Sequence, residues 1–306
     1  MMSEKKNIVL AGASIAGRNK RYVIWFYLLN LVCAWLGASG LGIHAHAILD
    51  HSLYSDRLLH GFDLAVFVEL INLPDFGPVR VLAGVSTIFA LLFFCVSLVL
   101  MPGVLLGYAS HHRLPRDQFY RACGRNVWRF VRLFLFLILL AGPVSGLLYW
   151  GLDALVTVAD QTSNERLPFF TQVAGTILTL LILTIFRIWF DLAQTDVVLR
   201  DQGTVGNSLG SALRTMRHNL GRLLASYILI DTLALGILAG GILSWNGIVP
   251  PSSVTGAFII SQTTSLLLLA VRFWQRATAV AFYEKQRDGL MATETHAVGA
   301  LENSTS

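Results

Sequence analysis

An acidic residue within an apolar run is the most distinctive chemical feature of this sequence. Asp231 lies in the stretch SYILIDTLALG, nine residues after Arg222. In a helix that rises 1.5 Å per residue, it would sit about 13 Å beyond that arginine. An ionised carboxylate in hydrocarbon costs about 2.5 kcal/mol or more, so this side chain must face other helices, accept hydrogen bonds or be protonated.

Hydrogen-bonding side chains at a similar depth are supplied by other apolar runs. The last run carries a polar stretch, SQTTS, seven to eleven residues before Arg272. We therefore predict an intramembrane polar cluster consisting of Asp231, Ser261, Gln262, Thr264, Ser265, Thr179 and Asn30. Two interpretations stay open: Asp231 is a packing residue that holds the fifth and sixth spans together, or it is a proton or cation site in a transporter.

Histidines and aspartates in the 44–80 segment are candidate metal ligands. Their helical spacing pairs His46 with Asp50 and His60 with Asp63, and imidazole and carboxylate groups are ordinary zinc ligands. No H-E-x-x-H motif accompanies them, and a solvated polar face on an interfacial helix explains the same residues. We predict no metal site and keep these four residues as weak candidates.

Catalytic motifs are not recognised elsewhere. The sequence contains no Walker-type phosphate loop, and its G-x-S-x-G match, GNSLG at 206–210, is not preceded by the apolar strand that a nucleophile elbow requires. The stretch IVLAGASIAG at 8–17 lacks the glycine register of a dinucleotide-binding turn and runs directly into an apolar segment. These observations favour a non-enzymatic protein without a cofactor, and a membrane-embedded metal hydrolase is the least favoured function.

Composition places these residues in a membrane. Of 306 residues, 55% are hydrophobic and 13% are charged, and the mean hydropathy is +0.62. Both values are too apolar for an ordinary soluble domain. Six apolar runs are long enough to cross the bilayer as helices, at about 23–43, 81–109, 130–150, 168–190, 222–245 and 254–282. The predicted fold is an all-α polytopic membrane bundle of six transmembrane helices.

Basic residues predict the orientation of this bundle. Twenty of the 23 lysines and arginines lie in the N-terminal segment, in the connections at 110–132 and 187–222, or after position 271. The alternate connections hold Arg57, Arg80 and Arg166. By the positive-inside rule, both termini face the cytoplasm, and the protein is a multi-pass inner (plasma) membrane protein. Because the net charge of +5 is spread in short blocks between apolar runs, it does not indicate nucleic-acid binding.

An internal repeat with an offset of 93 residues is visible in two cytoplasmic segments. RACGRNVWRF at 121–130 aligns with RTMRHNLGRL at 214–223. Each segment predicts an amphipathic helix with one basic and one apolar face, and each continues into a span without a helix breaker. Two parallel hairpin repeats, at about 80–158 and 173–251, follow from this alignment.

The basic faces of these amphipathic helices, at about 117–129 and 207–221, predict contact with anionic lipid. The residues expected to face headgroups are Arg121, Arg125, Arg129, Arg214 and Arg222. A protein partner or a phosphorylated ligand is the alternative. The expected partners are thus the anionic lipid bilayer and other membrane subunits.

The Arg-Asn-Arg pattern of these helices, together with the phrase LLHGFDLAVFVEL at 58–70, resembles uncharacterised six-span bacterial inner-membrane proteins. It is also loosely similar to the membrane domain of some glycerophosphodiester phosphodiesterases. The resemblance covers roughly residues 20–285, and it implies a bacterial inner-membrane location. A catalytic phosphodiesterase domain is not recognised in this sequence, so the resemblance does not imply that activity.

The predicted domain organisation and function follow from these features. Residues 1–22 form a cytoplasmic tail, residues 23–285 form the six-span membrane domain, and residues 286–306 form a disordered cytoplasmic tail. The leading functional hypothesis is a non-enzymatic scaffold or accessory subunit. The alternative is a secondary transporter or channel for a small polar solute or proton that uses Asp231.

Overall fold

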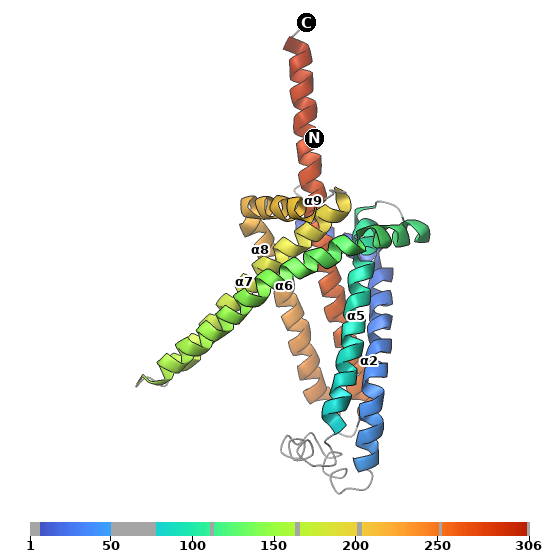
Figure 1. Cartoon of the computed structure of the whole chain (residues 1–306), viewed down its shortest axis with the longest axis vertical. Helices are drawn as coiled ribbons and strands as arrows, with labels where there is room; N and C mark the ends of the chain where they lie inside the picture. Colours follow the sequence, from blue (N-terminus) through green and yellow to red (C-terminus); the bar gives the residue numbers. More distant parts are fainter. Residues whose placement is uncertain are drawn as a thin grey trace. The chain divides into compact units, whose positions relative to one another are not determined.

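The computed structural model describes residues 7–49, 78–110, 113–162, 166–200, 204–250 and 253–304, without the side chains of 41–49, 78–83 and 287–304. These residues form helices and no strand (Figure 1). The helices are α1 (Ile8–Arg18), α2 (Lys20–Leu49), α5 (Pro78–Ala109), α6 (Arg116–Asp160), α7 (Leu167–Leu199), α8 (Val205–Ile248) and α9 (Val254–Ser304). The predicted all-α fold is confirmed for this part of the chain.

Six of the helices, α2 and α5 to α9, contain a segment long and apolar enough to cross a membrane. Large apolar side chains cover their outer surfaces: Leu139, Trp150 and Ile248 are 73%, 72% and 75% exposed. A helix in water would turn such residues toward a core, whereas hydrocarbon accepts them. The chain is therefore a multi-pass membrane protein.

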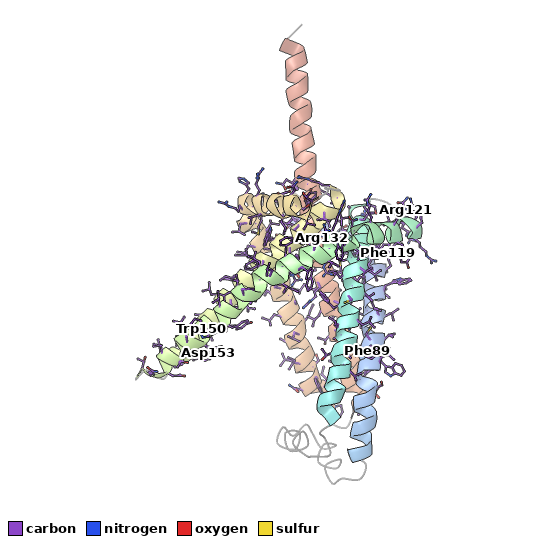
Figure 2. The ribbon with its side chains drawn as sticks, in the orientation of Figure 1. Phe89, Phe119, Arg121, Arg132, Trp150 and Asp153 are labelled. Atoms are coloured by element: carbon purple, nitrogen blue, oxygen red, sulfur yellow. The ribbon has the colours of Figure 1, made fainter. Side chains whose placement is uncertain are left out.

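The described residues pack as two compact units, each with its own core. The first contains the chain up to Arg18, residues 100–231, and the chain from Trp274 onward. In this unit α6 and α7 form an antiparallel hairpin (Figure 1). The start of α6 also packs on α5, because Gly103 leaves room for the Phe119 ring, which a Cβ atom would approach to 2.6 Å (Figure 2).

The second unit contains residues 19–99 and 232–273. In this unit α2 packs against α5, and Ser86 Oγ donates a hydrogen bond to the carbonyl of Gly37 at 2.7 Å. Phe26 of α2 also meets Phe273 of α9 edge to face, with ring centroids 5.0 Å apart.

The N-terminal segment contains a short helix that packs on α9. Residues 8–18 form helix α1, in which Ile8 and Val9 are buried. The indole Nε1 of Trp274 donates a hydrogen bond of 2.8 Å to the carbonyl of Val9. A Cβ atom at Gly12 would lie 2.8 Å from the backbone of Thr278, so α1 rests directly on the backbone of α9. Glycine permits this close approach because it has no Cβ.

The last helix is longer than the apolar run that predicts it. α9 continues to Ser304 and so includes most of the segment predicted to be disordered. No proline follows position 251, so the residue type that most strongly breaks a helix does not interrupt this segment.

The two amphipathic segments are parts of α6 and α8. When they are aligned with the offset of 93 residues, buried positions of one segment match buried positions of the other. Cys123 and Phe130 are buried in α6, and the aligned Met216 and Leu223 are buried in α8. Two exposed positions, 121 and 125, align with exposed positions 214 and 218. Each segment thus has one buried apolar face and one exposed basic face.

An asparagine makes the same local hydrogen bond in both segments. Nδ2 of Asn126 donates to the carbonyl of Ala122 at 3.1 Å, and Nδ2 of Asn219 donates to the carbonyl of Thr215 at 3.3 Å. The two helices differ at this point, because Asn219 has non-helical backbone angles (φ −128°, ψ 20°). α8 therefore bends at Asn219.

Candidate functional site

The carboxylate of Asp231 is paired within the first unit. Gln275 of α9, which is almost fully buried, donates a hydrogen bond from Nε2 to Asp231 Oδ1 at 2.5 Å. Nη1 of Arg187 on α7 lies 3.9 Å from the same oxygen, and the two side chains are 34% and 38% exposed. A counter-charge and an amide donor therefore compensate this carboxylate.

A second carboxylate, Asp191, lies one helical turn beyond Arg187 on α7. Its Oδ2 accepts a hydrogen bond of 2.9 Å from the hydroxyl of Tyr227 on α8. Tyr227 is fully buried, and Asp191 is 6% exposed. A hydrogen bond to a charged acceptor is stronger than one between neutral groups, so this contact ties α7 to α8.

A third carboxylate, Asp196, is fully buried. Its Oδ1 accepts hydrogen bonds from the hydroxyl of Tyr283 on α9 at 2.6 Å and from Ser211 Oγ on α8 at 3.1 Å. Nε of Arg200 lies 3.4 Å from the same oxygen, and its guanidinium carbon lies 5.4 Å from the centre of the Tyr283 ring. Oδ2 of Asp196 is buried and has no hydrogen-bond partner among the described residues.

These contacts form three polar groups along the interface of three helices, together called the polar network. It consists of Arg187, Asp191 and Asp196 on α7, Arg200 directly after α7, Ser211, Tyr227 and Asp231 on α8, and Gln275 and Tyr283 on α9. The contacts Arg187–Asp231 and Asp191–Tyr227 share one antiparallel register of α7 and α8. Along α7 the network extends over the ten residues 187–196, or about 13 Å of helix. Its evident role is to fix the register of three helices by hydrogen bonds.

The predicted polar cluster is distributed over both units. Thr179 is buried in α7, and Asn30 is half-buried in α2. In the last span, Ser261 and Thr264 donate to carbonyls of their own helix, and Thr264 also lies against Gly241 of α8. Ser265 is exposed.

Gln262 accepts a hydrogen bond of 3.1 Å from the hydroxyl of Tyr27, one turn before Asn30 on α2. Asp231 is paired with Arg187 and Gln275, which were not among its expected partners. The expectation placed Arg222 and Arg272 at the same depth in the membrane and compared residues by their distance from these arginines. Asp231 instead pairs with Gln275, which lies three residues after Arg272 on α9.

The hydropathy pattern does not single out Asp191 or Asp196. Both were assigned to a cytoplasmic connection because the preceding apolar run was ended at position 190. The segment IWFDLAQTDVVL has no glycine or proline, and α7 continues through it to Leu199 with residues 191–198 all buried. Two acids five residues apart in an unbroken helix were the available signal.

The basic residues expected at headgroups are mostly exposed. Arg121, Arg125, Arg214 and Arg222 are exposed, and Arg121 projects from the first turns of α6 (Figure 2). Arg129 is half-buried and donates to Asn126 Oδ1 at 3.4 Å.

The weak metal candidates fall where the structure gives no side chains. His46 lies on α2, and its side chain is not described; Asp50, His60 and Asp63, like the phrase at 58–70, lie outside the described residues. Within the described residues no group of three or more histidine, cysteine or acidic side chains could hold a metal ion.

Comparison with known proteins adds no relative. No family model, curated protein or solved structure matches the chain.

Proposed function

We propose that this chain is a non-enzymatic scaffold or accessory subunit of a bacterial inner membrane. The observation that carries the proposal is the compensation of Asp231 by Arg187 and Gln275. A carboxylate held between a cation and an amide donor stabilises helix packing, whereas a transport site must release its proton or cation during the cycle. The interpretation of Asp231 as a packing residue is therefore preferred.

The proposed location has both termini and both amphipathic segments in the cytoplasm. The distribution of lysine and arginine supports this orientation, and the resemblance to six-span bacterial proteins supports the choice of membrane. The shared burial pattern and the matching hydrogen bonds of Asn126 and Asn219 support a duplicated hairpin as its building unit.

One pair of variants tests the role of Asp231. Asp231→Asn should keep the unfolding midpoint near that of the native protein, because an amide still accepts a bond from Gln275. Asp231→Leu should lower stability, because Arg187 and Gln275 lose their acceptor. Asp153→Leu is the matched control, since Asp153 is exposed near the far end of α6 (Figure 2).

Proton flux into proteoliposomes, followed with an entrapped pH-sensitive dye, supplies the functional readout. The native protein should give no flux above protein-free vesicles. Flux that disappears in Asp231→Asn while the fold persists would overturn the scaffold proposal and assign transport to this residue.

A second candidate function is the transport of a proton or a small polar solute, and one observation favours it. Oδ2 of Asp196 is buried without a partner among the described residues, although an unsatisfied buried acceptor is costly. A group that binds transiently at this oxygen would relieve that cost. If so, Asp196→Asn abolishes flux, whereas Asp153→Asn does not.

A further inference from the structure

The first part of α8 presents an exposed basic face opposite its buried face. Val205, Ser208, Ala212 and Met216 are buried at intervals of three or four residues. On the opposite side of the helix, Arg214, Arg217 and His218 are exposed. Residues three and four positions apart share one side of a helix, so these three cationic or protonatable groups converge.

This face is also hollowed. An open cavity of ≈ 520 Å³ is lined by Gly210, Leu213, Arg214, Arg217 and His218. Gly210 lies one turn before Arg214, and a Cβ atom there would meet nothing within 4 Å. The cavity falls in the size range of ligand sites, about 300–1,000 Å³.

The charges in the cavity are available to a ligand. No hydrogen bond or ion pair is found for Arg214, Arg217 or His218 among the described residues, and residues 205–230 include no acidic residue. The equivalent face of α6 differs. There Arg121 has an acidic neighbour, Asp117, at 3.9 Å, and Gly124 occupies the position that aligns with Arg217.

We propose that the face of α8 formed by Gly210, Arg214, Arg217 and His218 is a phosphate-binding site, and that its ligand is the phosphate of an anionic lipid headgroup. Guanidinium groups match phosphate oxygens through paired N–H donors. Two such groups with a neighbouring imidazole suit a tetrahedral anion better than a single surface arginine does.

The choice of a lipid follows from connectivity and rests on the proposed membrane orientation. This part of α8 lies between the end of α7 and the bend at Asn219, after which α8 becomes apolar. A helix joining two spans in this way lies at the membrane surface, where headgroup phosphates are the most concentrated anions. Free phosphate is the other possible source of the same chemistry.

The test uses the full-length protein, purified in neutral detergent and titrated with phosphatidylglycerol, phosphatidylcholine or inorganic phosphate. Native mass spectrometry counts the bound ligand. The site variant is Arg214→Gln/Arg217→Gln, and the matched control is Arg121→Gln/Arg125→Gln on α6. Circular dichroism checks that each variant is folded. The native protein should prefer phosphatidylglycerol, and the site variant should lose about 30-fold in affinity, since it removes two direct guanidinium contacts to the phosphate at roughly fivefold each.

The control pair should change the affinity less than about threefold, and Arg214→Lys/Arg217→Lys should retain most of the binding lost in the glutamine pair, because it keeps both charges. Equal losses in the α6 and α8 pairs would overturn the site, because they would show general surface attraction. Binding of inorganic phosphate without preference for phosphatidylglycerol would overturn the lipid assignment. Labelling of introduced cysteines in intact cells tests the membrane orientation separately. A failure of the orientation can therefore be distinguished from a failure of the phosphate site.

Discussion

Replacing Tyr227 with phenylalanine tests the most enclosed contact of the polar network. The substitution removes one hydroxyl and leaves the ring in place. Among the described residues, Asp191 has no side-chain hydrogen-bond donor other than Tyr227. The variant therefore leaves Asp191 Oδ2 buried and without a donor.

The expected loss follows from the burial of this pair. A hydrogen bond to a charged group contributes about 1.5–3 kcal/mol in proteins. Hydrogen bonds between membrane helices average about 0.6 kcal/mol, because the unfolded state in lipid also finds partners. Tyr227 is 0% exposed and Asp191 is 6% exposed, so the acceptor cannot gain water without local opening. We expect a loss of about 2 kcal/mol, equivalent to about 30-fold in the unfolding equilibrium constant.

Unfolding in mixed micelles with increasing dodecyl sulfate, followed by circular dichroism, measures this loss. Tyr149→Phe is the control, since Tyr149 is 59% exposed and its variant should stay within about 0.5 kcal/mol of the native protein. The double variant Tyr227→Phe/Asp191→Leu should be at least as stable as Tyr227→Phe, because it removes the stranded acceptor. The reasoning is refuted if Tyr227→Phe matches Tyr149→Phe, or if the effects of Tyr227 and Asp191 substitutions simply add.

Three further predictions address other parts of the chain. Tyr283→Phe should cost less than Tyr227→Phe in the same unfolding assay, about 1 kcal/mol, because Asp196 Oδ1 retains Ser211 and Arg200; a larger loss would contradict this order. Gly12→Leu should release α1 from α9 and expose the chain near Arg18 to trypsin, whereas Gly17→Leu, with open space at its Cβ, should not; equal cleavage would show that α1 is not docked. In a variant without native cysteines, a membrane-impermeant thiol reagent should label Gln161→Cys but not Asn207→Cys in intact cells, both positions being exposed; the reverse pattern would invert the topology.

Local features of the sequence were sufficient to predict the helices. A run of about 20 apolar residues must form a helix in hydrocarbon, because its backbone groups have no water to bind. The six spans and the amphipathic segments before Phe130 and Leu223 could be predicted in this way. The same local information failed at α1, where the burial of Ile8 and Val9 depends on contact with a helix more than 260 residues away.

Only the tertiary structure decided which side chains meet. Hydropathy marked Asp231 as costly, but its partners depend on how far α7 and α9 slide along α8, and a sequence contains no direct measure of that register. One turn of helical shift would place different residues of α9 opposite Asp231. Asp191 and Asp196 could not be assigned from the sequence for a related reason. An acidic residue near the end of an apolar run has the same neighbours in sequence whether it is exposed to water or buried between helices. Burial by Tyr227 and Tyr283, both distant in sequence, makes these two carboxylates part of the polar network.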